Sequence, residues 1–201
     1  MHISEGVLSG PVLAAGALLS GAGVALGLKK TPYEKIPQVG LFSAAFFVAS
    51  LIHVPLGPTS VHLVLNGLVG LVLGWAAFPA ILVGLLLQAL LFQFGGITTL
   101  GVNTFDMAFP ALLSFWIFGP VVRSESHKVA LLGAFLTGAL AILLAGLLVA
   151  LALSLTGEAF RYAARAVLLA HLPIMGVEGI LTAFSVAFLR RVRPEMLEGS
   201  R

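Results

Sequence analysis

Five histidines are the residues of this 201-residue chain that could bind a transition metal, because the sequence contains no cysteine. Imidazole nitrogen is a common ligand of nickel, cobalt, zinc and copper, whereas thiolate sites and iron–sulfur clusters require cysteine. A single histidine at the edge of an apolar segment is more often a hydrogen-bonded boundary residue than a ligand, so position must distinguish the two interpretations. The histidines are His2, His53, His62, His127 and His171.

The position of His2 favours a metal role. A histidine directly after a free N-terminal residue can offer the amine of Met1, its own backbone nitrogen and its Nδ1 to one ion, closing two chelate rings. These three nitrogens lie in a plane, and square-planar nitrogen coordination selects Ni(II) or Cu(II) over zinc, magnesium or calcium. We expect His62 to supply the fourth nitrogen. The alternative is that Met1 and His2 form a frayed chain end without a role.

His62 follows a segment, Pro55 to Ser60, that is broken by proline and glycine. Irregular backbone at membrane depth is tolerated only where it lines a cavity or is buried in protein. We expect Thr59 and Ser60 to cap a helix that has His62 in its first turn. His53 comes just before this segment, and we expect it to be a hydrogen-bond partner of the site or a boundary residue rather than a ligand.

Other polar residues are expected to line the same cavity. Gln88 and Asn103 are candidate donors or acceptors, and the glycine-rich loop 93–103 between them either lines the cavity, covers it or is a plain connection. Glu178 is an ionisable residue inside an apolar segment, where a functional or paired role is the default. It follows His171 by seven residues, so both side chains can face one side of a helix. Glu178 is consistent with a proton or metal path and with a polar clamp on the N-terminal segment.

The composition predicts that the elements holding these residues lie in a membrane. Hydrophobic residues make up 59% of the chain and charged residues 9%, with a mean hydropathy of +1.10, whereas soluble domains carry about a quarter charged residues. No charged residue occurs from Ile36 to Phe105. Dividing the chain at charges, prolines and glycine-rich breaks predicts one transmembrane domain of seven helices, at 7–28, 38–54, 60–74, 78–94, 106–122, 129–155 and 172–189.

The basic residues predict an orientation. With the N-terminus outside, all but two of the eleven Lys and Arg residues fall on the inner side, the exceptions being Arg161 and Arg165. Four of the five histidines then lie at the outer side. We expect Asp106 to cap the fifth helix and residues 158–170 to lie along the membrane surface. No basic stretch precedes the first span, which favours a retained N-terminus over a cleaved signal peptide.

Missing motifs narrow the function. The sequence has no GxxxxGK[ST] phosphate loop, so ATP-driven transport requires ATPase subunits on other chains. HExxH and GxSxG are absent, which disfavours an intramembrane protease. We interpret the net charge of +3 as a record of topology and not of nucleic-acid binding. The alternatives to metal uptake are a passive channel or secondary carrier for a small solute, and an intramembrane metalloenzyme with Glu178 as its base.

Four motifs that span nearly the whole chain resemble the CbiM/NikM family. They occur in the family's order at residues 1–6 (MHISEG), 53–63 (HVPLGPTSVHL), 88–103 (QALLF and GGITTLGVN) and 178–195 (EG and RPE). Members of this family are the metal-binding membrane components of energy-coupling-factor-type cobalt and nickel importers.

The resemblance implies an all-α integral membrane protein of seven transmembrane helices in the plasma or inner membrane. Its N-terminus would lie outside, inserted toward the bundle centre, and its C-terminus in the cytoplasm. The transported substrate would be Ni²⁺ or Co²⁺ held by Met1, His2 and His62, without an organic cofactor or an enzymatic activity. A transmembrane coupling subunit, ATPase subunits, a small accessory membrane subunit and membrane lipid are the implied partners. Asp106 stands where the family often has asparagine, which leaves the choice of metal open.

Overall fold

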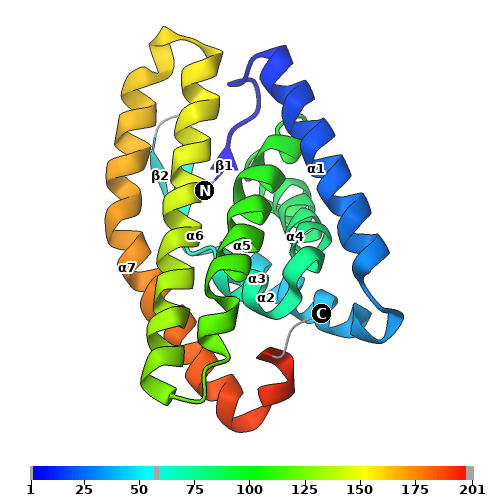
Figure 1. Cartoon of the computed structure of the whole chain (residues 1–201). Coiled ribbons are helices and arrows are strands. Elements are labelled where there is room, and N and C mark those ends of the chain that lie inside the picture. Colours follow the sequence, from blue (N-terminus) through cyan, green and yellow to red (C-terminus); the bar gives the residue numbers. More distant parts are fainter. Residues whose placement is uncertain (1, 57–58, 198–201) are drawn as a thin grey trace.

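The computed structural model describes residues 2–56 and 59–197, without the side chains of residues 53–61. The described chain is a helical bundle in which α6 and α7 form a long antiparallel hairpin beside α1, α4 and α5 (Figure 1). Short 3-10 turns follow α1, α3, α6 and α7. The α-helices are α1 (Gly10–Lys30), α2 (Ile36–Ala49), α3 (Asn66–Leu73), α4 (Ala77–Phe92), α5 (Leu100–Val122), α6 (His127–Thr156) and α7 (Arg161–Val192).

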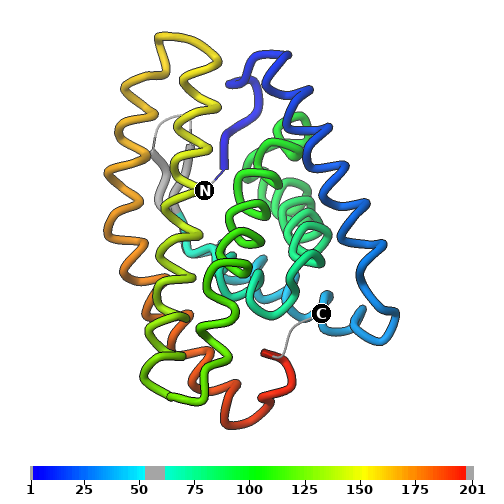
Figure 2. The backbone as a smooth tube through the Cα atoms, viewed as in Figure 1, coloured from blue at the N-terminus to red at the C-terminus, as the bar shows by residue number. Residues whose placement is uncertain are grey.

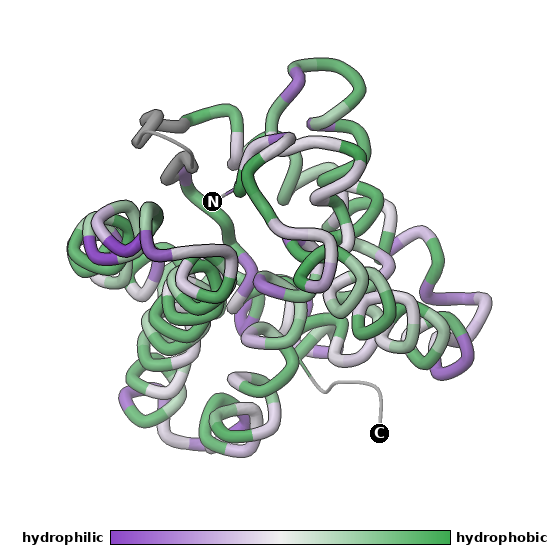
Figure 3. Tube along the Cα trace, turned by 90° about the horizontal axis from the view of Figure 1, so that it is seen from above, coloured by the Kyte–Doolittle hydropathy of each residue, from purple (hydrophilic) through white to green (hydrophobic). Residues whose placement is uncertain are grey.

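The predicted helical class is confirmed, but seven separate membrane spans are not. Five segments of the described chain are long and apolar enough to cross a membrane: Gly10–Lys30, Asn66–Phe92, Leu100–Val122, His127–Thr156 and Glu158–Val192. The segment containing α3 and α4 counts once, and α2 has only 14 residues, whereas a span needs about 20. The trace is hydrophobic over most of its length, and hydrophilic positions are confined to short stretches (Figure 3).

Glycines allow the helices to approach closely. A Cβ at Gly70 of α3 would lie 2.2 Å from the carbonyl oxygen of Ala111 in α5, so the two backbones are almost in contact. Gly23 and Gly27 of α1 face α4 and the turn before it: a Cβ at Gly23 would meet the ring of Phe78 at 2.3 Å, and one at Gly27 the carbonyl oxygen of Trp75 at 2.6 Å. The GxxxG spacing of Gly23 and Gly27 therefore marks a packing face of α1.

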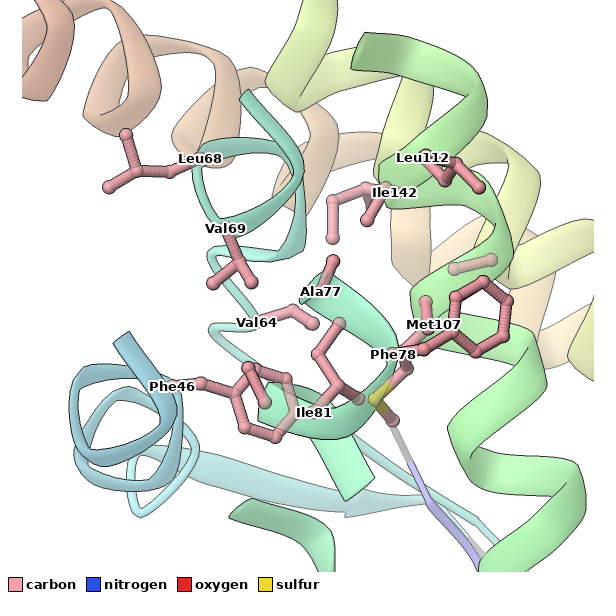
Figure 4. Packing of buried hydrophobic residues seen from close by; sticks show 14 of the residues in the cluster. Phe46, Val64, Leu68, Val69, Ala77, Phe78, Ile81, Met107, Leu112 and Ile142 are labelled. Atoms are coloured by element: carbon pink, nitrogen blue, oxygen red, sulfur yellow. The ribbon is translucent and has the colours of Figure 1, made fainter. Parts of the chain in front are cut away.

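The hydrophobic core lies where α2, α4, α5 and α6 meet α3 (Figure 4). Phe46, Ile81, Met107 and Ile142 come from four different helices and have no exposed surface. Val64, which directly precedes α3, is equally buried among them. This packing fixes α4 and α5, which carry Gln88 and Asn103.

A three-stranded antiparallel sheet interrupts the helices. It consists of β1 (His2–Ile3), β2 (His53–Leu56) and β3 (Thr59–His62), in the order β1-β3-β2. The residue His53 pairs with His62 across β2 and β3, and His2 pairs with Ser60 across β1 and β3. The strand β1 lies in the middle of the molecule (Figure 1), and the segment after it passes between α6 and α1 (Figure 2).

The sheet shows that the prediction of a helix from residue 60 was wrong. Thr59 and Ser60 are strand residues and do not cap a helix, and α3 begins only at Asn66. The physical reason is that β1 and β2 both pair with β3, which satisfies its backbone groups without a helix. Leu65, in the left-handed conformation with φ of 55°, separates the strand from α3.

Three other predicted boundaries were also wrong. The helix α5 begins at Leu100, so Asp106 is a buried residue within the helix and not its cap. The second helix ends at Ala49, and His53 falls in β2. No separate surface helix covers 158–170 among the described residues, because α7 is continuous from Arg161 through Pro173. Ala164 and Val167 on one face of its first turns are buried in the core, so these turns pack as part of the hairpin of α6 and α7.

Candidate metal site

Asn103 of α5 holds the N-terminal segment by its backbone. Its Oδ1 accepts a hydrogen bond from the Ile3 N–H at 2.8 Å, and its Nδ2 donates to the Ile3 carbonyl at 3.1 Å. The amide group therefore pairs with Ile3 as a neighbouring strand would. This is the contact that places His2 at the centre of the bundle.

The loop 93–103 packs against the same segment. The Glu5 N–H donates to the carbonyl of Gly95 at 3.1 Å, and the Thr98 N–H donates to Oε1 of Glu5 at 3.3 Å. Gly95 has a φ of +76°, and a Cβ there would lie 3.0 Å from Nδ2 of Asn103. A glycine is needed here because of both its conformation and this close approach.

His2 is 2% exposed, and its Nε2 contacts the side-chain oxygen of Gln88. The other end of the Gln88 amide donates to the hydroxyl of Ser50. An amide oxygen only accepts hydrogen bonds, so Nε2 of His2 carries the proton and Nδ1 carries the lone pair. A chelate with the N-terminal amine would use this Nδ1.

The ring of His62 stacks on the ring of His2, with their centroids 4.5 Å apart and their planes inclined by 25°. His62 is 3% exposed, and its Nδ1 donates to the carbonyl of Leu63 at 2.6 Å. Its Nε2 has no hydrogen-bond partner within the described part of the chain. Burial lowers the pKa of His62 to about 4, so at neutral pH the ring is uncharged and Nε2 keeps its lone pair.

The helix α7 supports this site from another side. Glu178 is fully buried, and its carboxylate accepts hydrogen bonds from the backbone N–H groups of Val64 and Leu65, the latter at 3.0 Å. Glu178 is thus a polar clamp on the residues after His62 and not on the N-terminal segment. His171 lies on the same helix and is 2% exposed.

For the remaining candidates the structure describes either the backbone only or nothing. Met1 lies outside the described residues, as do the side chains of His53, Thr59 and Ser60, whose backbones belong to the sheet. No group of three or more His, Asp or Glu residues that could hold a metal ion occurs among the residues that the structure describes. A chelate that uses amine and backbone nitrogens besides two imidazoles is not such a group.

Two contributors to the site were missed from the sequence. Ser50 orients Gln88, and Glu5 joins the N-terminal segment to the loop 93–103. Ser50 is a small polar residue in a long uncharged stretch, a weak signal that many membrane helices share. Glu5 is the first charged residue of the chain and had a stronger signal, since it follows His2 by only three positions.

Residues 2–196 match the family described as the cobalt uptake substrate-specific transmembrane region. A Haemophilus influenzae protein whose name assigns it to metal transport is 42% identical over 199 residues, covering 98% of this chain and 97% of its own. The fused nickel transport protein NikMN of Rhodobacter capsulatus is 33% identical over 196 residues, covering 84% of this chain and 54% of its own. The crystal structure of a transition metal transporter, 27% identical, superimposes with a TM-score of 0.77 over 96% of this chain and 93% of its own.

Proposed function

The chain belongs to the CbiM family of cobalt uptake transmembrane regions, and from this premise we propose that it captures Ni(II) or Co(II) as the substrate-binding component of an uptake system. It is a multi-pass membrane protein of a family of transport components. The passage of the ion, and not a chemical conversion, is its proposed task.

The stacking of His2 and His62 at the bundle centre is the observation that carries this proposal. In the proposed plane the His2 backbone nitrogen lies between the Met1 amine and His2 Nδ1, so His62 would be the neighbour of His2 Nδ1. The stacked rings, with centroids 4.5 Å apart, support this because they hold the two imidazoles side by side. Gln88 fixes the tautomer of His2 that offers Nδ1. The site so assigned consists of the Met1 amine, the His2 backbone nitrogen, His2 Nδ1 and His62 Nε2.

An all-nitrogen set of this kind suits Ni(II), and the name of the Rhodobacter relative supports nickel. The family description supports cobalt. Carboxylates are not needed as ligands, because Glu178 is occupied by two backbone N–H groups. This distinguishes the site from the oxygen-rich sites of magnesium and calcium.

The proposed system needs partners and an orientation. We assign the N-terminus to the outer side and the C-terminus to the cytoplasm, because all but two of the eleven Lys and Arg residues then fall on the inner side of the predicted topology. ATP hydrolysis is assigned to separate ATPase subunits, acting through a transmembrane coupling subunit. The length of the fused Rhodobacter relative, of which this chain matches about half, supports an additional membrane subunit.

The free amine is the most specific part of the proposal, and it can be tested. One alanine added before Met1 should abolish high-affinity Ni(II) binding, measured by titration calorimetry on detergent-purified protein with a C-terminal affinity tag. Mass spectrometry verifies each N-terminus, and circular dichroism verifies the fold. His127→Ala, at an exposed position at the start of α6, serves as the matched control and should bind normally. Unchanged affinity in the extended protein would rule out the amine chelate.

A further inference from the structure

His171 is a second buried imidazole with a nitrogen that no described residue hydrogen-bonds. Its Nδ1 donates to the carbonyl of Val167 at 2.5 Å, one helical turn earlier in α7. Its Nε2 is buried and, among the residues described, has no hydrogen-bond partner. Because the proton is on Nδ1, Nε2 carries the lone pair.

His62 and His171 share this arrangement. In each ring a backbone carbonyl holds Nδ1, and Nε2 is a buried acceptor left without a partner by the described residues. An unsatisfied buried polar group costs about 1–3 kcal/mol, and native proteins rarely tolerate one without a reason. Two such nitrogens in one region indicate that something binds them.

The two rings belong to the same neighbourhood. A positive charge on His171 is close enough to contribute to lowering the pKa of His62. The strand β3, which ends at His62, contacts α7. Glu178 of α7 holds the two residues after Leu63 by their N–H groups and so fixes the position of His62 relative to this helix.

The packing of α6 on α7 gives the His171 ring its place. A Cβ at Gly146 of α6 would lie 3.1 Å from Cγ of His171, so only a glycine leaves the ring ordinary space. The ring is therefore held by Val167 on one side and by α6 on another. Such fixation is what a ligand needs, because it lowers the entropy lost on binding.

We propose that His62 and His171 form a second, transient position for the transported ion, with Nε2 of each ring as a ligand. This position rests on the proposed function, since the ion would reach it from the N-terminal chelate. In the transfer the ion keeps His62, releases the Met1 amine and the His2 nitrogens, and gains Nε2 of His171. The released amine and backbone nitrogen take up protons from water. A two-imidazole position binds less tightly than the chelate, and the ion can leave it more readily.

The transient position can be measured when the chelate is removed. The full chain with one alanine before Met1 should keep a weaker Co(II) site, detected by titration with visible absorption spectroscopy. Adding His171→Gln to this extended protein should weaken the residual site about tenfold or more, since even outer partners of a metal ligand contribute 10–100-fold. His171→Gln with the native N-terminus should keep high-affinity binding. Extended protein with His127→Gln is the matched control and should equal the extended protein.

Each outcome decides between the two proposals. High-affinity binding that survives the extension contradicts the amine chelate, and with it the transfer of the ion from that chelate to His171. No residual site in the folded extended protein, or one that His171→Gln does not change, overturns the transient position. If the His171 variant folds poorly, a second measurement that needs no substitution at His171 still tests the proposal. In ¹⁵N-histidine NMR of the extended protein, Ni(II) should shift the Nε2 resonances of two rings, and a shift of only one overturns the proposal.

Discussion

The side-chain oxygen of Gln88 in α4 accepts a hydrogen bond from Nε2 of His2, a residue 86 positions earlier in the chain. Ser50, at the end of α2, holds the other end of the same amide. The helix α4, which the hydrophobic core holds in place, thus sets through Gln88 the tautomer of the His2 ring in β1. In the proposed chelate, the choice of Nδ1 as the ligand nitrogen of His2 is therefore set by a residue that is not itself a ligand.

Replacing Gln88 with leucine should weaken Ni(II) binding without unfolding the protein. The leucine fills the space but accepts no hydrogen bond, so the proton of His2 is no longer held on Nε2. Loss of a hydrogen bond behind a metal-ligating histidine typically lowers affinity about 10–100-fold. Titration calorimetry measures this, and Leu90→Ala on the exposed side of α4 is the control. Equal affinity of Gln88→Leu and the native protein would show that Gln88 does not orient the ligand.

Asn103→Ala should release the N-terminal segment. The substitution removes both hydrogen bonds to Ile3, each worth about 1 kcal/mol net and more where a buried partner is left unsatisfied. We expect faster amide hydrogen exchange at residues 2–5 together with weaker metal binding. Thr98→Ala is the control, because Thr98 binds Glu5 through its backbone N–H, which the substitution keeps. Unchanged exchange in Asn103→Ala would contradict the role of this amide.

Glu178→Ala should destabilise the protein more than Glu178→Gln. Alanine leaves the N–H groups of Val64 and Leu65 without their acceptor in a buried environment, and each unsatisfied group costs about 1–3 kcal/mol. Glutamine keeps one acceptor oxygen. Thermal unfolding in detergent compares the three proteins. Equal melting temperatures for the two variants would mean that the two N–H groups find other acceptors.

The long helices were predictable from the sequence because lipid requires every backbone group to be satisfied within the segment. The same rule explains the error at residues 60–65. The backbone of Thr59 to His62 is satisfied by β1 and β2, and the chain segments involved are more than 50 positions apart for β1. No local pattern contains that pairing. The motif with proline and glycine indicated an irregular segment but not that it is a hairpin.

The sequence singled out candidate residues for the site, but it did not predict the contacts that they make. His2 was a candidate because it directly follows Met1, and Glu178 because it is a charged residue inside an apolar segment. That Glu178 would bind Val64 and Leu65, rather than the N-terminal segment, depends on how α7 packs. The continuity of α7 through Pro173 depends on the same packing, since an isolated proline favours a break or kink.

Gly70→Ala should destabilise the bundle, whereas Gly21→Ala should not. A Cβ at Gly70 would lie 2.2 Å from the Ala111 carbonyl oxygen, and a backbone atom in the core cannot move aside cheaply. A Cβ at Gly21 meets no described atom within 4 Å, and alanine there gains about 0.5–1 kcal/mol of helix propensity. Melting temperatures that shift in opposite directions are the expected result. Equal shifts would show that α3 can move away from α5.

The stability of the metal-free protein should depend on pH through His62. Burial lowers the pKa of this ring from 6.5 to about 4, so between these values the unfolded chain binds a proton that the folded chain does not. Folding stability therefore falls as the pH is lowered through this interval, by up to roughly 3 kcal/mol. The control is His62→Gln. The neighbouring histidines His2 and His171 are unchanged in this variant, so their contribution is the same in both proteins. Melting temperatures measured with a chelator from pH 7 to pH 4 should fall more steeply for wild type, and parallel profiles would show that His62 is not buried uncharged.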